Sequence, residues 1–462
     1  MEATFLLVQI LKNWWWVFFS FFFFLTARFF YFWWIRWEVF YKKAFKWVLL
    51  EIIPPKEVLK PFSAMETIYS LMFGLYDSPN WKERWCKGTF PLAGGGWFSF
   101  EICSFGGEIH FFLRVPAGFK SSAQAAIYSQ YPETEIKEVE DYTQRVPKDI
   151  PNEKWDLYSE DYTLQKPDHY PIKTYSMFFE RPEEEKRVVE EKRLDPLNSL
   201  LEALSQFQSG EQIWFQLVCV PFSDDQYPWI EKGKKEVNKL SKREASSPSK
   251  GILSSIIDGI YNLVIELTSA IFGSTPPTPS KKEKPLEIIA PELRLTAGER
   301  EVISAIERKL TKTAFLCWMK VVYICNKEKP FSFGNYLTFR GYLTPQFSAE
   351  HLNRIVFFGA TRTRIHYWFR DRRLYLRKRQ RLREYVERLP SFFPWNITGE
   401  PPPFIKFLTY FGYRIPPGRK STLILNAEEL ATIFHFPVRI YIPTVPRVEV
   451  KKIGPPPTLP GA

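Results

Sequence analysis

A long apolar run near the N-terminus constrains this chain more than any other feature. Residues 13–35 read NWWWVFFSFFFFLTARFFYFWWI and contain one charged side chain, Arg28. A helix of this length would span about 34 Å, which is enough to cross a hydrocarbon core of about 30 Å. The apolar residues favour insertion by about 4–5 kcal/mol in total, against a cost of about 3 kcal/mol for a central arginine. The run therefore predicts a transmembrane helix.

The residues that border this run predict its orientation. Six tryptophans lie at its two ends, where indole rings prefer the headgroup layer: Trp14, Trp15, Trp16, Trp33, Trp34 and Trp37. Four basic residues follow the run, namely Arg36, Lys42, Lys43 and Lys46. By the positive-inside rule we expect a single-pass protein of the cell inner membrane with a cytoplasmic C-terminal body. The run is too long for a typical signal peptide. A re-entrant segment stays open as an alternative.

The pattern after residue 97 is typical of an α+β fold. Extended segments at 97–104 and 108–116 flank Gly106 and Gly107, which predict a two-residue hairpin. A helix at 121–131 and a strand at 135–139 complete a β-β-α-β order. Further strands are expected at 170–179, 211–221, 313–326 and 421–425. The expected fold class is therefore α+β, with an N-terminal transmembrane helix followed by ferredoxin-like, split β-α-β sandwich domains.

Helix boundaries are indicated by capping residues. Asp195 is expected to cap a helix at 196–208, Thr296 a helix ending at Leu310, and Asn426 the helical turn AEELATIF. Charged helices are predicted at 229–240 and 371–388.

Composition divides the chain into four regions. Residues 1–53 hold the transmembrane helix and an amphipathic membrane-surface helix at 38–53, which Pro54 and Pro55 end. Residues 54–240 form one or more α+β domains, and 241–290 form a linker with an amphipathic helix at 251–273. That helix either rests on a membrane or a partner, or covers its own domain. Residues 291–462 form a second α+β domain with a basic helix and a proline-rich tail.

The sequence offers little support for catalysis. In the segment PGRKST at 417–422, Arg419 occupies the place of the glycine that a phosphate-binding loop requires before its lysine. The five histidines and five cysteines lack metal-ligand spacing, and no nucleophile elbow or dinucleotide fingerprint occurs. We therefore expect a protein that is not an enzyme, with no catalytic residue, no metal site and no cofactor.

The most informative charged region is 362–388, which carries a net charge of +8 out of +12 for the whole chain. Tyr367, Trp368, Tyr375 and Tyr385 are interspersed among its basic residues. Arginine with aromatic side chains suits nucleic-acid backbones and exposed bases, but anionic lipid or an acidic protein surface stays equally open. The candidate nucleic-acid- or lipid-binding residues are Arg370, Arg372, Arg373, Arg377, Lys378, Arg379, Arg381 and Arg383.

Several long phrases carry a family resemblance. They include WFSFEICSFGGEIHFFLRVP (97–116), DPLNSLLEALSQFQSGEQIWFQ (195–216) and STLILNAEELATIFHFP (421–437). The chain resembles an uncharacterised family of membrane-anchored bacterial proteins, which is similar in turn to the membrane-proximal region of conjugation-type coupling ATPases of the HerA–FtsK class. In the fused relatives a segment like LNAEELATIFHFP shortly precedes the ATPase core, whereas no such core follows it here.

This resemblance implies a membrane-anchored, non-enzymatic component or adaptor of a type IV secretion-like or DNA-transfer machine. The expected partners are the membrane, a separate motor ATPase acting in trans, DNA, and further copies of the chain. The alternative is an envelope scaffold that binds anionic lipid through its basic and amphipathic helices.

Overall fold

The computed structural model describes residues 2–30, 46–55, 60–78, 96–178, 195–224, 228–241, 295–328, 331–365, 369–391, 421–437 and 446. The chain divides into two compact units. Unit 1 comprises Met1–Tyr227 and Lys312–Ala462, and unit 2 comprises Pro228–Thr311. Unit 2 is therefore an insertion in the sequence of unit 1. The helix expected at 251–273 lies outside the described residues, and the expected domain boundaries stay a prediction.

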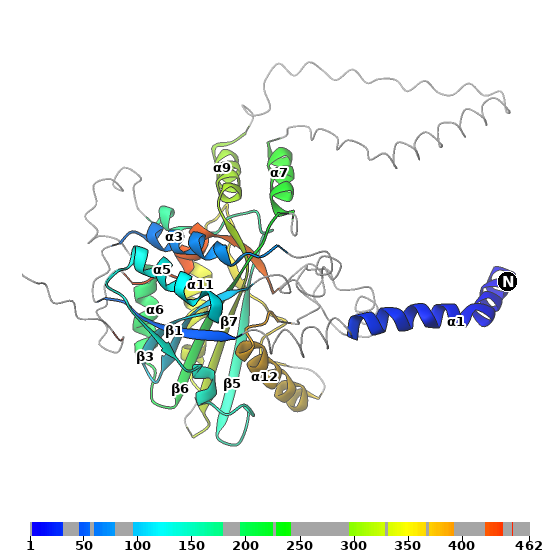
Figure 1. The fold of residues 1–462 in the computed structure, drawn as a ribbon, viewed down its shortest axis with the longest axis horizontal. Coiled ribbons are helices and arrows are strands. Elements are labelled where there is room, and N and C mark those ends of the chain that lie inside the picture. The colour runs from blue at the N-terminus through cyan, green and yellow to red at the C-terminus, as the bar shows by residue number, and fades with distance from the viewer. Residues whose placement is uncertain are drawn as a thin grey trace, which may run out of the picture. The chain divides into compact units, whose positions relative to one another are not determined.

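Unit 1 is built on one nine-stranded antiparallel sheet (Figure 1). Its strands are β1 (Trp47–Ile53), β2 (Phe98–Phe105), β3 (Glu108–Pro116), β4 (Glu135–Val139), β5 (Trp155–Leu164), β6 (Glu211–Pro221), β7 (Ala314–Asn326), β8 (Ile355–Phe357) and β9 (Leu423–Asn426). The order is β4-β1-β3-β2-β6-β7-β5-β8, and β9 also pairs with β7. The α+β class and the strands expected at 211–221 and 313–326 are thus confirmed.

The long strand β7 joins segments that are far apart in the sequence. Its residues 319–326 pair with β5, its residues 314–317 pair with β9, and β6 runs along its other side. Nearly the whole strand is buried, as expected for a strand covered on both faces.

The hairpin between β2 and β3 depends on its two glycines. Gly106 and Gly107 have φ angles of 61° and 99°, the left-handed region that glycine adopts without strain. A Cβ on Gly107 would also lie 2.9 Å from the carbonyl oxygens of Ser205 and Phe207. The turn predicted from the dipeptide is confirmed, and the close approach explains why a side chain is excluded there.

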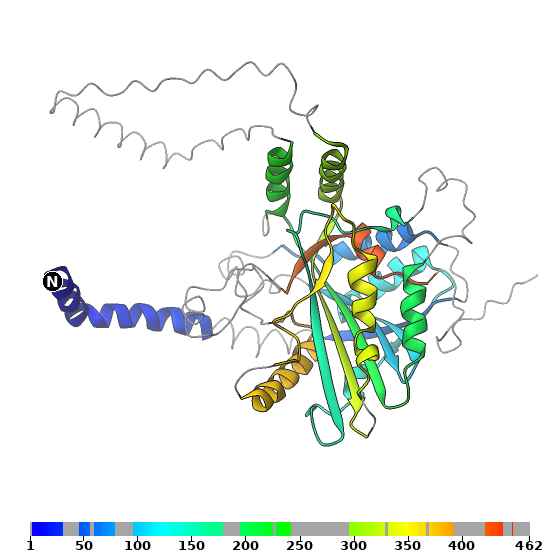
Figure 2. The same cartoon turned by 180° about the vertical axis from the view of Figure 1, so that it is seen from behind.

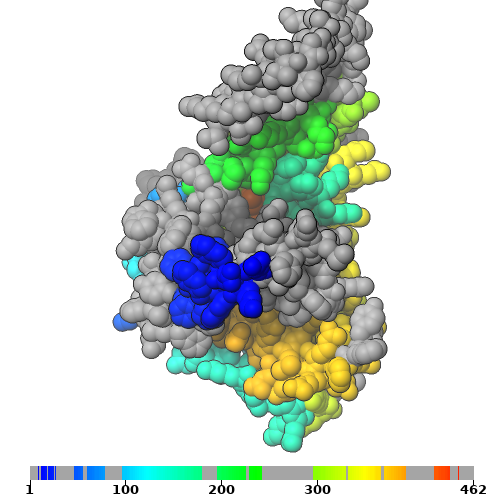
Figure 3. Space-filling model, turned by 90° about the vertical axis from the view of Figure 1, so that its right-hand side faces the viewer, coloured from blue at the N-terminus to red at the C-terminus, as the bar shows by residue number. Residues whose placement is uncertain are grey.

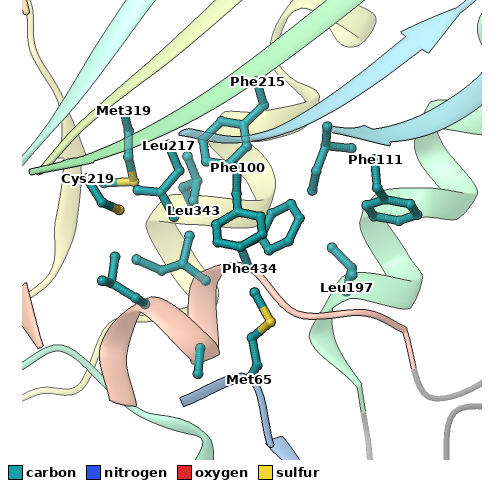
Figure 4. Close-up of a cluster of buried hydrophobic side chains, with 14 of the residues drawn as sticks. Met65, Phe100, Phe111, Leu197, Phe215, Leu217, Cys219, Met319, Leu343 and Phe434 are labelled. Carbon is teal, nitrogen blue, oxygen red and sulfur yellow. The ribbon is translucent and has the colours of Figure 1, made fainter. Parts of the chain in front are cut away.

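One face of the sheet, face A, carries the main hydrophobic core. It is covered by α3 (Phe62–Met72), α5 (Lys120–Gln130), α6 (Pro196–Ser205), α11 (Thr338–Gln346) and α14 (Ala427–Ile433), which Figures 1 and 2 show from opposite sides. Side chains from β2, β3 and β6 meet residues of these helices in a dense cluster (Figure 4). The cap residues expected for two of the helices are confirmed, because Asp195 accepts from Leu197 N–H and Asn426 forms a capping box with Glu429.

The opposite face, face B, is smaller and partly polar. Its apolar cluster includes Phe112, Tyr142, Trp214 and Val322, and α12 (Arg370–Val386) packs on it through Leu382 and Tyr385. The remaining short helices in the described part of unit 1 are η2 (Phe73–Leu75), η3 (Ala117–Phe119), η4 (Tyr142–Arg145), η5 (Tyr175–Met177) and α10 (Phe333–Tyr336).

Unit 2 contains two helices in its described part, α7 (Trp229–Leu240) and α9 (Ala297–Thr311). Gly233 of α7 leaves space for Leu310 of α9, whose Cδ2 would lie 2.6 Å from an added Cβ. Thr296 caps α9, because its hydroxyl accepts from Glu299 N–H while the Glu299 carboxylate accepts from Thr296 N–H. Both helices were expected at these positions.

The prediction of an N-terminal transmembrane helix is wrong. Residues 2–30 form α1 (Glu2–Phe30), and no helix within the described part of the chain is long and apolar enough to cross a membrane. The polar side chains Asn13 and Arg28 bound a stretch of only about 21 Å, shorter than a hydrocarbon core of about 30 Å. Three tryptophans with polar N–H groups reduce the apolar character of this stretch further.

The prediction of a surface helix at 38–53 is also wrong for the part that the structure describes. Residues 47–53 form β1, which pairs with β3 and β4, while 38–45 lie outside the described residues. Leu49 belongs to the face B cluster, whereas Leu50 and Ile52 belong to face A. A short apolar run fits a helix and a buried strand equally well, so that only pairing partners distinguish them.

The predicted domain architecture and one predicted strand are also wrong. Separate ferredoxin-like sandwiches are not formed, since β1–β9 belong to one sheet. Residues 170–178 hold no strand and include η5, whereas the unexpected β5 lies at 155–164. The sequence WDLYSEDYTL of β5 resembles an exposed, polar segment. The cations that pair with its carboxylates lie more than 150 positions away in the chain, so the local sequence does not show that the strand is buried.

Candidate functional site: an arginine-rich helix on a buried ion network

The candidate site is α12, whose eight basic and two acidic residues give it a net charge of +6, half of the chain's net charge of +12. Leu382 and Tyr385 bury its apolar side against face B, and arginine, lysine and glutamine are good helix formers on its other sides. The helix ends at Val386, and Arg388, two residues later, adopts a φ of 54° while Leu389 N–H donates to Glu384 O. This left-handed position usually takes glycine, so the arginine there has a specific tertiary role.

A row of polar residues crosses the sheet beneath α12. Glu101 of β2 lies opposite Gln216 of β6, Gln216 lies opposite Lys320 of β7, and Lys320 lies opposite Asp161 of β5. All four side chains are buried. Buried charges are stable only when they are paired and hydrogen-bonded, and the partners here come from α12 and the residues just after it.

Arg388, just after α12, supplies a fully buried guanidinium to this row. Arg388 Nε donates to Glu101 Oε1 at 3.0 Å and Nη2 donates to Oε2 at 3.1 Å, a bidentate pair. Its Nη1 also donates to Asp141 Oδ2 at 2.5 Å. Tyr142 O–H completes the shell by donating to Glu101 Oε2 at 2.6 Å.

A second group of ion pairs lies further along the row. Lys320 Nζ is 3.3 Å from Glu384 and donates to Leu389 O at 2.7 Å. Arg381 pairs with Glu384 at 3.0 Å and lies 3.5 Å from Asp161, and Ser391 O–H donates to Asp161. On the outer side of this group, Lys378 pairs with Asp156 at 2.6 Å.

The electrostatics of the network show which charges the fold stabilises. Burial opposes ionisation of Asp141, but Arg388 and the hydrogen bonds from Thr143 outweigh this effect and lower its pKa. Burial raises the pKa of Asp161 and lowers the pKa of Lys320, although each lies near opposite charges. Burial also lowers the pKa of Arg388, yet Glu101 and Asp141 more than compensate and raise it well above its ordinary value.

The structure separates the eight candidate residues into three groups. Lys378 and Arg381 are buried in the ion pairs described above, so they hold the helix in place. Arg377 is half-buried and donates to Arg362 O at 2.9 Å. The remaining five are exposed on the surface of α12, which Figure 3 shows in orange: Arg370, Arg372, Arg373, Arg379 and Arg383.

Three of the five exposed arginines form a stripe along the helix. Arg372, Arg379 and Arg383 lie seven and four positions apart and therefore share one side of the helix, spread over about 16 Å. Two exposed apolar or aromatic residues border them, Leu376 at 56% exposure and Tyr375 at 41%. Arg379 donates to the Tyr375 hydroxyl at 2.7 Å, and its guanidinium lies 5.5 Å from the ring centroid. We call Arg372, Tyr375, Leu376, Arg379 and Arg383 the arginine face.

Sequence reasoning missed the buried half of this arrangement. A signal was present, because Glu101 and Lys320 are single charges inside otherwise apolar strands. Such residues are rarely buried without a partner. The sequence does not identify that partner, since Glu101 and Arg388 are 287 positions apart.

His435 and His110 occupy structural positions. His435 is buried, with Nε2 2.9 Å from Asp195 Oδ1 and its ring edge-on to Phe62. His110 Nδ1 lies 2.6 Å from Glu51, and this hydrogen bond lowers the pKa of the Glu51 carboxyl. Within the described ranges, no group of three or more His, Cys, Asp or Glu side chains could hold a metal ion.

Comparison with known proteins adds no assignment. No protein-family model matches the chain. No curated protein shows significant similarity to it.

Proposed function

We propose that this protein is a non-catalytic adaptor of a DNA-transfer machine, and that it contacts the DNA backbone through the arginine face of α12. The observation that carries this proposal is the separation of the helix's cations into buried and exposed sets. The buried set fixes the helix on the sheet, which leaves Arg372, Arg379 and Arg383 presented to solvent on a rigid support.

Such a stripe is suited to a polyanion. Guanidinium groups form charge-assisted, bidentate hydrogen bonds with phosphate oxygens, and a fixed row loses little conformational entropy on binding. Because phosphate contacts release counterions, they give affinity without sequence preference. An adaptor that holds DNA while another protein moves it needs this kind of contact.

The assignment to a DNA-transfer machine rests on the sequence resemblance described above. The segment 421–437, which resembles the region preceding the motor core of coupling ATPases, forms β9 and α14 and packs into the core of unit 1. We propose that the motor ATPase is a separate protein and that this chain supplies a binding platform for it.

A second candidate function is a scaffold that binds anionic lipid. Leu376 is 56% exposed between arginines, and an apolar side chain beside cations also favours insertion into a headgroup layer. The exposed surface near the start of α12 contains Phe369 as well. The experiment below distinguishes the two functions.

The test is binding of the full chain to a labelled DNA duplex, measured by fluorescence anisotropy across a salt series. Replacing Arg372, Arg379 and Arg383 with glutamine should weaken binding strongly at low salt. The slope of log affinity against log salt concentration is negative. If each arginine neutralises one phosphate, the magnitude of this slope should decrease by about 2.7, since each contact contributes about 0.9.

A matched control removes three exposed cations elsewhere. Lys232, Lys234 and Lys239 lie on exposed positions of α7, and their replacement with glutamine changes the net charge equally. This control should bind nearly as the natural sequence does. Equal loss in both triple variants would contradict the proposed site. Binding to anionic vesicles in the absence of DNA binding would instead support the lipid-binding scaffold.

A further inference from the structure

The start of α12 presents aromatic surface that the proposed backbone contacts do not use. Phe369, immediately before the helix, is 80% exposed and has a φ of 55°. A bulky residue at positive φ is uncommon and strained by about 1–3 kcal/mol. Neither exposure of the ring nor this backbone conformation benefits folding.

A second aromatic ring lies on the same stretch of helix. Tyr375 follows Phe369 by six positions, about 9 Å along the axis, and is 41% exposed. The Arg379 guanidinium donates a 2.7 Å hydrogen bond to the Tyr375 hydroxyl and so lies beside the Tyr375 ring. Ring and guanidinium together offer a polarisable surface, on which a planar base stacks favourably.

We infer that the arginine face, together with Phe369, binds single-stranded nucleic acid in preference to duplex. This inference rests on the proposed function and specifies its substrate class. In a duplex the flat faces of the bases are covered by their neighbours, so that exposed aromatic rings gain little from it. In a single strand the bases are free to stack on Phe369 and Tyr375 while Arg372, Arg379 and Arg383 contact the phosphates.

Charge and apolar surface occur together here in the arrangement that this substrate requires. Arg372 lies between the two aromatic positions in the sequence, and Arg379 and Arg383 continue the cationic row beyond Tyr375. A polyanion that also exposes flat apolar rings is complementary to such a surface in both respects. An acidic protein segment would match the charge but would not need a row of rings alternating with arginines.

The experiment compares a labelled thymidine oligonucleotide of about 20 nucleotides with a duplex of the same length, using the full chain. Phe369→Leu keeps an apolar side chain but removes the aromatic ring, and Phe369→Trp restores a ring. We expect Phe369→Leu to weaken single-strand binding by about 5- to 100-fold, with little change for duplex, and Phe369→Trp to bind as the natural sequence does. Tyr375→Leu should behave like Phe369→Leu.

Phe333→Leu is the matched control, because Phe333 is 56% exposed but lies on α10, away from α12 in the sequence. It should leave both affinities unchanged. Equal affinity for single strand and duplex, or full single-strand binding by Phe369→Leu, would overturn this inference while the backbone-binding function stands. Binding to anionic vesicles but to neither nucleic acid would overturn the proposed function as well.

Discussion

Replacing Arg388 with alanine is expected to lower the free energy of unfolding by about 3–5 kcal/mol, because it leaves the buried Glu101 carboxylate and the half-buried Asp141 carboxylate without their cation. Arg388 is fully buried and holds both oxygens of Glu101, which is itself fully buried, as well as Asp141. The low local dielectric makes an unpaired charge at this position costly. Urea denaturation monitored by tryptophan fluorescence measures the effect.

Two further variants identify the cause of this loss. Arg383→Ala removes an exposed arginine from the same helix and should change stability by less than about 0.5 kcal/mol. Combining Arg388→Met with Glu101→Gln and Asp141→Asn removes the charges together, and it should restore most of the lost stability. A loss of under about 1 kcal/mol in Arg388→Ala would show that water reaches the carboxylates and that the network is not dry.

The pH dependence gives an independent check with a definite sign. The pKa of Asp141 is lowered from its ordinary value of 3.8, so its stabilising contribution is complete above that value and is lost as the pH falls through the lowered folded pKa. Asp161 has the opposite sign, because its raised pKa makes the fold more tolerant of acid at that position. We therefore expect the stability deficit of Arg388→Ala to shrink as the pH falls through the lowered pKa of Asp141, because the protonated Asp141 carboxyl no longer needs the cation. A deficit that is independent of pH would point to lost packing instead.

Replacing Phe100 with alanine is the second change expected to have a large effect, about 3–5 kcal/mol of unfolding free energy. Phe100 is fully buried on face A, where its ring centroid lies 4.7 Å from that of Phe434 and 5.2 Å from that of Tyr69 (Figure 4 shows the first of these neighbours). Truncation removes these contacts and leaves a cavity between β2 and the end of α14. Thermal and urea denaturation both measure the loss.

The control for this prediction is Phe333→Ala, which truncates a ring that is 56% exposed. It should cost less than about 1 kcal/mol. Phe100→Leu conserves most of the volume and should lie between the two variants. If Phe100→Ala were as mild as Phe333→Ala, the core on face A would be able to collapse around the missing ring.

Features that depend on neighbouring residues were predictable from the sequence. The β2–β3 hairpin follows from Gly106 and Gly107, which adopt positive φ angles without a steric penalty. The starts of α6, α9 and α14 follow from Asp195, Thr296 and Asn426, whose side chains accept backbone N–H groups within three positions. Continuous apolar runs identified β6 and β7.

Features that depend on distant partners were not predictable in this way. The short apolar run of β1 fits a helix or a strand, and its pairing with β3 and β4 decides between them. The polar sequence of β5 resembles a solvated loop until Arg340 and Arg381 pair with its carboxylates. The apolar run near the N-terminus led to a wrong prediction of a transmembrane helix, because no helix in the described part of the chain is long and apolar enough to cross a membrane.

The candidate site shows the same division within a single helix. The sequence by itself determined that residues near 371–388 form a strongly basic helix, because composition and helix propensity are local properties. It could not determine which cations are presented to a ligand, since the buried Arg381 and Arg388 differ from the exposed Arg372, Arg379 and Arg383 only in their surroundings. Only the tertiary structure decided this, because a buried cation requires a carboxylate nearby in space, and those carboxylates come from strands more than 200 positions away in the chain.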